Sequence, residues 1–152
     1  MNKEALTGKL KKGSLWICIV CVLAVLFNVT AVTILCIRYR LADLPDPVSR
    51  YSVIREYITY GIGAVIMLLA ALLFFRIAMS GIPFSAKNVR TVRIIGILFL
   101  LNAVIPSVII GGVITPFYTA NYTSLIEGLL LLFITHVIRY GAVLQQESDE
   151  TL

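Results

Sequence analysis

The sequence predicts an all-α integral membrane protein with four transmembrane helices. Of its 152 residues, 59% are hydrophobic and only 14% are charged, and the mean hydropathy is +0.95, whereas a soluble domain is about one-quarter charged. The chain also contains four apolar runs, each long enough to cross the ~30 Å hydrocarbon core of a bilayer as a helix. A disordered chain is excluded as well, because such chains are poor in apolar residues.

The apolar runs place the helices in order along a single predicted domain, residues 1–152. The third run contains Pro106, and the fourth contains one acid, Glu127. Each run has few or no charges and is longer than a buried helix of a soluble domain requires. The expected spans are residues 14–37, 57–75, 94–115 and 118–138.

Polar segments separate the spans. Residues 41–55 hold two prolines and two aspartates, which predict an extended or turned segment outside the membrane. In the loop at residues 76–93, a glycine and a proline precede Ser85, whose hydroxyl suits a helix N-cap. A basic helix is therefore expected to begin near Ala86 and to continue into the third span. Residues 139–152 form a C-terminal tail.

The basic residues predict the orientation in the membrane. Nine of the thirteen Lys and Arg residues lie in residues 1–13, in residues 76–93 and at Arg139, whereas four lie in residues 38–56. An even number of spans puts both termini on one side. The positive-inside rule therefore places the N- and C-termini in the cytoplasm.

This topology also explains the net charge of +5. No basic stretch is long enough to form a nucleic-acid patch, so no direct nucleic-acid binding is expected. The expected partner is the lipid bilayer, whose anionic head groups would lie near the basic loops.

Three polar residues fall inside the predicted spans, Glu127, Asn28 and Asn102. An acid inside a membrane is a candidate functional residue, and Glu127 would suit a proton-coupled exporter of cationic compounds. Its position two or three turns from the outer end favours instead a structural ion pair with an outer arginine such as Arg38 or Arg55. The two amides predict interhelical hydrogen bonds and a contact between the first and third spans.

Small residues and cysteines complete the candidates within the spans. Ala103, Ser107 and Gly111 recur every four residues, which predicts a packing face that is used within the chain or in a homodimer. Cys18 and Cys21 form a C-x-x-C pair. They lie near the predicted cytoplasmic end, in a reducing compartment, so we interpret them as packing residues rather than a redox centre.

The sequence contains no recognisable catalytic constellation. It has a single histidine and none of the motifs typical of zinc proteases, serine hydrolases or phosphate-binding loops. We therefore expect no enzyme activity, no catalytic residues, no cofactor and no metal site.

The C-terminal tail is acidic. Glu147, Asp149 and Glu150 stand near the end of a predicted helix, where the helix dipole disfavours negative charge. These acids are expected to fray into water, to pair with the basic loop on the same face of the membrane, or to bind a cytoplasmic partner.

Two segments carry a distinctive pattern. Before the third span the chain reads S-G-x-P-F-S-x-K-N-V-R-x-x-R-I-I-G-I-L, and it ends with R-Y-G-A-x-L-Q-Q-E-S-D-E-T-L. Both segments resemble the signature blocks of a bacterial family of small four-span membrane proteins of unknown function. The matching positions are Gly81, Pro83, Phe84, Lys87, Asn88, Val89, Arg93, Ile95, Gly96, Gly141, Leu144, Gln145, Glu147, Asp149 and Thr151.

Members of that family are commonly encoded beside a small helix-turn-helix DNA-binding protein. The resemblance therefore implies a cytoplasmic regulator as partner and the bacterial cytoplasmic membrane as location. These features predict a non-catalytic membrane component of a regulatory pair, which docks the regulator through residues 81–93 and the acidic tail. The alternative is a small proton-coupled transporter or exporter that uses Glu127. The residues expected to bind the regulator are Lys87, Asn88, Arg90, Arg93, Gln145, Glu147, Asp149, Glu150 and Thr151.

Overall fold

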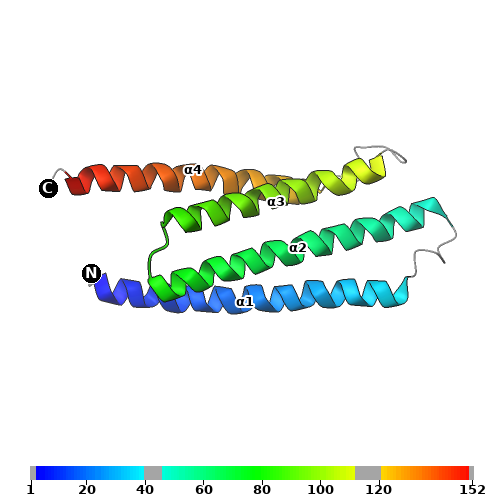
Figure 1. The fold of residues 1–152 in the computed structure, drawn as a ribbon, viewed down its shortest axis with the longest axis horizontal. Coiled ribbons are helices and arrows are strands. Elements are labelled where there is room, and N and C mark those ends of the chain that lie inside the picture. The colour runs from blue at the N-terminus through cyan, green and yellow to red at the C-terminus, as the bar shows by residue number, and fades with distance from the viewer. Residues whose placement is uncertain (1–2, 40–45, 112–120, 151–152) are drawn as a thin grey trace.

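The computed structural model describes residues 3–39, 46–111 and 121–150, which form four long helices. All four are long and apolar enough to cross a membrane, so the predicted all-α fold with four spans is confirmed. The helices alternate in direction, and both ends of the chain lie at the same end of the molecule (Figure 1). In chain order they are α1 (Lys3–Arg38), α2 (Pro47–Ser80), α3 (Ala86–Gly111) and α4 (Tyr122–Glu150).

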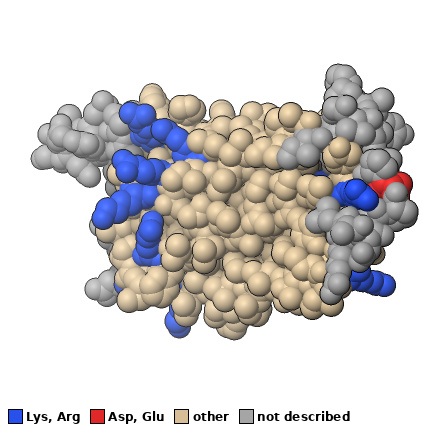
Figure 2. Space-filling model, turned by 45° about the vertical axis from the view of Figure 1, so that its right-hand side comes forward, with Lys and Arg blue, Asp and Glu red and all other residues tan. Residues whose placement is uncertain are grey.

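The helices are longer than the hydrocarbon core is thick. α1, α2 and α4 contain 36, 34 and 29 residues, which correspond to about 54, 51 and 44 Å against a core of ~30 Å. On α2, Glu56 and Arg76 are about 30 Å apart along the axis, so the two charges fit the two boundaries of the core. Figure 2 shows this division as a belt without charged side chains between groups of charged residues at the two ends.

The helices pack in series rather than around one central core. Within the described residues, α1 packs on α2, α2 on α3 and α3 on α4. The most buried side chains, Ile66 and Thr135, lie in these seams and are each 2% exposed. On α1, by contrast, Trp16 and Phe27 are 69% and 67% exposed. In a bilayer such apolar surface contacts lipid at no hydrophobic cost.

The start of α2 differs from the prediction. Residues 47–55 are helical, so the prediction of an extended or turned segment is wrong from Pro47 onward; residues 40–45 lie outside the described part. Asp46 is the N-cap, since its two carboxylate oxygens accept hydrogen bonds from the Ser49 backbone N–H at 3.1 Å and hydroxyl at 2.6 Å. Pro47 stands in the first turn, where no N–H donor is needed. The same residue types that break a helix therefore begin one here.

Polar and small residues line the seam between α1 and α2. The Cys18 thiol donates to the carbonyl oxygen of Ala71 at 3.4 Å, and Cys21 is buried. Both thiols are free, and their interpretation as packing residues stays a prediction. The Asn28 amide donates to the backbone of its own helix at 2.8 Å. A Cβ atom added at Gly63 would lie only 2.8 Å from Asn28 Oδ1. The glycine therefore leaves the space that the Asn28 amide occupies.

The backbones of α3 and α4 approach each other closely at two glycines. A Cβ on Gly128 would lie 2.9 Å from the carbonyl oxygen of Gly96 and 2.8 Å from Leu100 Cδ2. Next to this crossing, Asn102 Nδ2 donates to Ser124 Oγ at 3.3 Å. Small residues thus bring the two backbones together, and an amide and a hydroxyl bond across the seam, as is typical of helices packed in lipid.

Contrary to the prediction, the two amides do not join the first and third spans. Asn28 lies against α2 and Asn102 bonds to α4, because the rotation of each helix about its axis decides which neighbour an amide meets. Ala103, from the predicted small-residue face, is 4% exposed and so is covered within the chain. The surroundings of Ser107 and Gly111 lie outside the description, and the homodimer stays a prediction.

The glycine crossing gives a test of the α3–α4 packing. Gly128→Ala is expected to lower the free energy of unfolding by about 1–3 kcal/mol, because the added methyl group meets backbone that has no room to move. Gly61→Ala is the matched control, since a Cβ there meets nothing within 4 Å. Alanine at that position should leave stability unchanged or raise it by about 1 kcal/mol. Denaturant titration in detergent micelles, followed by circular dichroism, measures the free energy of unfolding of each variant. If Gly128→Ala were as stable as Gly61→Ala, the described crossing would be contradicted.

Candidate functional site

The candidate site is the turn between α2 and α3, which lies at the same end of the molecule as both termini (Figure 1). α2 ends at Gly81, whose φ of 70° is left-handed and whose N–H donates to the carbonyl oxygen of Ile77 at 2.8 Å. A side chain at this φ would be strained. α1 also reaches this point, because a Cβ on Gly81 would lie 3.0 Å from Lys11 Cε and from Thr7 Cγ2. The turn is therefore fixed both by its backbone and by α1.

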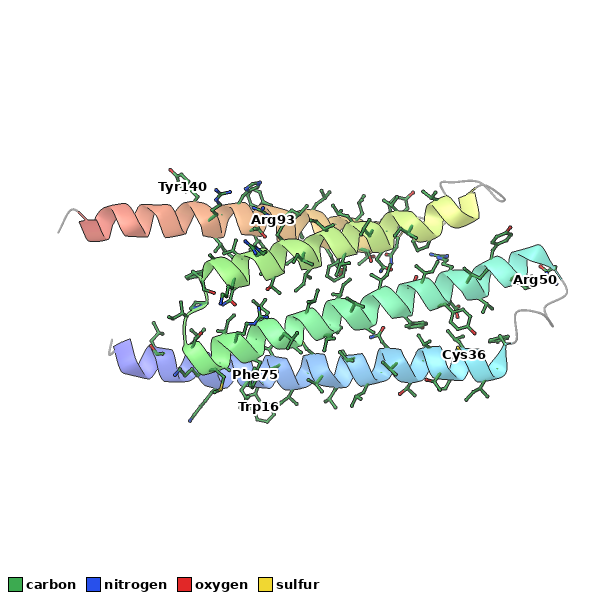
Figure 3. The ribbon with its side chains drawn as sticks, in the orientation of Figure 1. Trp16, Cys36, Arg50, Phe75, Arg93 and Tyr140 are labelled. Atoms are coloured by element: carbon green, nitrogen blue, oxygen red, sulfur yellow. The ribbon has the colours of Figure 1, made fainter. Side chains whose placement is uncertain are left out.

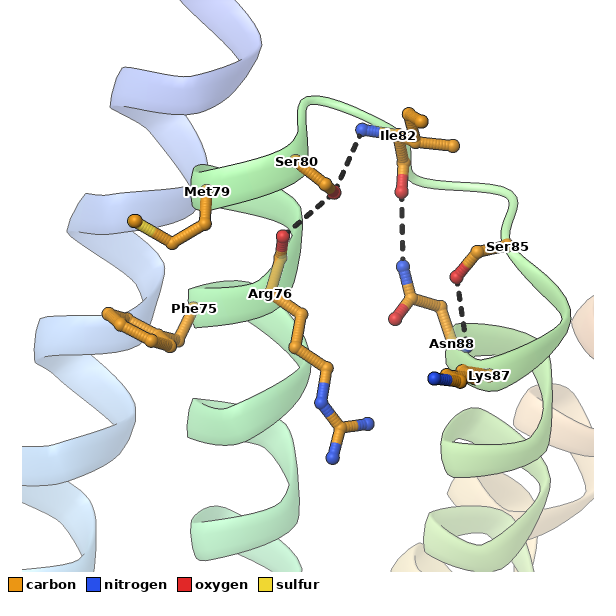
Figure 4. Close-up of a pocket in the computed structure, with 8 residues that line it drawn as sticks. All are labelled: Phe75, Arg76, Met79, Ser80, Ile82, Ser85, Lys87 and Asn88. Carbon is orange, nitrogen blue, oxygen red and sulfur yellow. Dashed lines mark hydrogen bonds between the residues drawn. The ribbon is translucent and has the colours of Figure 1, made fainter.

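Asn88 holds the other side of the turn. Its side-chain amide donates to the carbonyl oxygens of Ile82 and Pro83 at 3.1 and 3.2 Å, and its backbone N–H donates to Ser85 Oγ at 3.2 Å (Figure 4). The predicted N-cap at Ser85 and the helix start at Ala86 are confirmed. Asn88 is only 3% exposed. It therefore builds the turn rather than presenting an amide to a partner.

A second link joins α2 and α3 one turn deeper. The Arg76 guanidinium donates from Nη1 to Thr91 Oγ1 at 3.3 Å, and the Thr91 hydroxyl donates to the carbonyl oxygen of Lys87 at 3.0 Å. Thr91 is 8% exposed, while the Arg76 side chain is exposed. The buried hydroxyl thus orients an exposed cation toward α3.

The outer surface of the turn is basic and partly apolar. Residues 76–93 contain four basic residues and no acid, and Lys87, Arg90 and Arg93 are exposed. Ile82 and Phe84 are also 59% and 58% exposed. Lys and Arg side chains gather at this end (Figure 2). We call this end of the molecule the basic end; its exposed cations are Lys9, Lys11, Lys12, Arg76, Lys87, Arg90, Arg93 and Arg139.

A groove of about 610 Å³ opens between α2 and α3 at the basic end. Ser80, Ser85 and the two cations Arg76 and Lys87 supply its polar lining, together with Asn88. Its apolar lining is Phe75, Met79 and Ile82. Sequence reasoning did not find this groove, because the residues come from two helices and no spacing within either one indicates it.

The tail continues α4 instead of fraying. The helix extends to Glu150, and its last turns reach beyond the α2–α3 turn (Figure 1). The side chains of the predicted tail residues Gln145, Glu147, Asp149 and Glu150, and the whole of Thr151, lie outside the description. The structure therefore brings the helix of the tail to the basic end and leaves the contacts of its acids a prediction.

The polar residues inside the spans lie away from the groove. Glu127 is exposed on α4, about 8 Å along the axis from Tyr122, where the helix begins. Among the described residues, neither Arg38 nor Arg55 pairs with it, so the ion pair expected with these two arginines is not seen there. Asn102 is buried and bonds to Ser124, but its Oδ1 has no hydrogen-bond partner among the described groups.

Comparisons with known proteins give no further guide. The chain matches no protein family model, no curated protein and no solved structure. Among the described residues, no three His, Cys, Asp or Glu side chains come together where they would hold a metal ion. The site must therefore be interpreted from its own geometry.

The exposure of Glu127 leads to a test. Glu127→Gln is expected to change the free energy of unfolding by no more than about 0.5 kcal/mol, because no described partner loses an interaction. Denaturant titration in detergent measures this change, and efflux of a cationic dye from vesicles under a pH gradient measures transport. We expect no proton-coupled flux that depends on Glu127; a pH-dependent efflux that this substitution abolishes would favour the transporter instead.

Proposed function

We propose that this protein is a non-catalytic component of a bacterial cytoplasmic membrane, and that it holds a small soluble DNA-binding regulator at its cytoplasmic face. The basic end would face the cytoplasm, as the positive-inside rule requires. Residues 81–93 and the tail at the end of α4 would form the docking surface. The helix-turn-helix class of the regulator rests on the family resemblance of these two segments.

The observation that carries the proposal is the fixed geometry of the α2–α3 turn. Gly81, Ser85 and Asn88 satisfy backbone groups of the turn, so the backbone that carries its exposed side chains has a defined shape. A preorganised surface loses little conformational entropy when a partner binds. Lys87, Arg90 and Arg93 would present charge, while Asn88 would contribute by holding the turn.

The charges of the docking surface suit a regulator of DNA. The tail brings Glu147, Asp149 and Glu150 to the same end as the cations of the turn. A DNA-binding protein has a basic face that contacts phosphates. Carboxylates of the tail would compete with phosphate for that face, and the neighbouring cations would orient the partner and disfavour wrong ones. Capture by the membrane would then keep the regulator from its DNA.

The transporter alternative has less support. A carboxylate that carries protons needs access to water from a cavity within the helices. Glu127 does not line the groove described above, which lies at the opposite end of the molecule, and its side chain is exposed on α4. We therefore do not propose transport as the function.

Removal of residues 147–152 tests the docking surface. The truncated protein keeps all four spans, so it should insert normally but lose at least about tenfold of its regulator binding, because three carboxylates are removed. The measurement is affinity purification from native membranes, with identification of any captured helix-turn-helix protein. The variant Glu147→Gln/Asp149→Asn/Glu150→Gln keeps the length of the tail and should show the same loss.

Salt provides the control for this experiment. At roughly 0.5 M salt the Debye length falls to about 4 Å, so capture by the full-length protein should weaken as well. If the truncated protein retains full capture, or if no helix-turn-helix protein is recovered with the intact chain, the docking proposal is wrong.

A further inference from the structure

The groove between α2 and α3 combines two chemistries in one cavity. Figure 4 shows the Arg76 guanidinium and the Lys87 side chain between the two helices, and Phe75 and Met79, which also line the groove, projecting from α2. Phe75 and Met79 are 49% and 68% exposed although they are apolar. The groove of about 610 Å³ therefore offers cations to one part of a ligand and apolar surface to another.

The two cations of the groove have no acidic partner in the described structure. Arg76 donates to the neutral hydroxyl of Thr91, which orients the guanidinium without neutralising its charge. No acid occurs anywhere in residues 76–93. A guanidinium and an ammonium that line one groove favour a phosphate, because both donate charge-assisted hydrogen bonds to its oxygens.

The depth of the groove matches the head groups of a bilayer. Arg76 is about 30 Å along α2 from Glu56, so it lies at the boundary of the hydrocarbon core when Glu56 lies at the other boundary. Met79 and Ser80 are one turn further out. A phosphate held by Arg76 and Lys87 would therefore be at the height of lipid phosphates, beside Phe75 and one turn deeper than Met79.

We propose that this groove is a binding site for an anionic phospholipid. Arg76 and Lys87 would bind the phosphate, and Ser85, whose oxygen accepts from the Asn88 N–H, would donate its hydroxyl to the head group. Phe75, at the depth of Arg76, would contact the upper part of an acyl chain, and Met79, one turn nearer the water, would cover the head group. A free phosphate shares the chemistry of the head group, but it would leave the exposed apolar side chains uncovered. This inference does not rest on the proposed regulator.

Fluorescence quenching tests the site with a probe in the groove itself. Trp16 is the single tryptophan of the chain, so Trp16→Phe/Met79→Trp moves the only tryptophan into the lining. This protein is reconstituted into phosphatidylcholine vesicles that contain a minor fraction of brominated phosphatidylglycerol or, in parallel, of brominated phosphatidylcholine. Brominated phosphatidylglycerol should bind at least about five-fold more tightly than brominated phosphatidylcholine, because each Lys or Arg near an anionic surface strengthens binding by about that factor.

Charge variants separate the groove from general attraction to the basic end. Arg76→Gln/Lys87→Gln should abolish the preference for phosphatidylglycerol. Arg90→Gln/Arg93→Gln is the matched control, because it removes the same charge from exposed positions on α3, at the same end of the molecule, that do not line the groove. Lys87→Gln alone should lose part of the preference while it keeps the bond from Arg76 to Thr91, which guards against a folding defect; circular dichroism checks that each variant is helical.

The outcomes are distinct. Loss in the groove variants alone supports the site. An equal loss in the control pair means that the whole basic end attracts anionic lipid, and this would overturn the proposal, as would the absence of any preference in the unsubstituted groove. Inorganic phosphate, added in excess over the anionic lipid, should leave the preference unchanged; if phosphate removes it, the groove takes a soluble anion and the assignment to lipid is wrong.

Discussion

A peptide group inside hydrocarbon must find its hydrogen-bond partner within the protein, because lipid offers none. This constraint explains why the described chain is almost wholly helical and why its elaborate capping occurs at helix ends. At the α2–α3 turn, Gly81 and the side chain of Asn88 supply the donors that water would otherwise supply. Because these bonds are made within the turn, the turn has a fixed backbone shape, and both proposed sites depend on that shape.

The same solvent changes what holds the helices together. Apolar side chains gain little by leaving lipid, so close packing and interhelical hydrogen bonds decide which helices meet. The contact of Gly96 with Gly128 and the bond of Asn102 to Ser124 are of this kind. Because each helix packs mainly on its neighbours along the chain, large apolar surfaces of α1 stay exposed to lipid. The same arrangement leaves the groove between α2 and α3 open at the basic end.

Four spans and their order could be predicted from the sequence because length and apolarity alone decide them. The neighbours of Asn28 and Asn102 could not, since they depend on how each helix is rotated. The start of α2 could not be predicted from Asp46 and Pro47 alone, because a carboxylate and a proline are common both after the end of a helix and at the start of the next. The hydrogen bond from Ser49 to Asp46 shows that here they begin a helix. The basic turn was found from its charges, whereas the role of Asn88 within it required the carbonyl positions of Ile82 and Pro83.

The proposed docking of a cytoplasmic regulator requires that the basic end face the cytoplasm, and labelling with a membrane-impermeant maleimide measures this directly. Single cysteines are introduced as Phe84→Cys and Ser52→Cys into a chain whose three native cysteines are replaced by alanine. Both positions are exposed, and they lie at opposite ends of the molecule. In intact cells the cysteine at 52 should be labelled and the one at 84 only after permeabilisation. Labelling at 84 in intact cells, with protection at 52, would contradict the orientation on which the account depends.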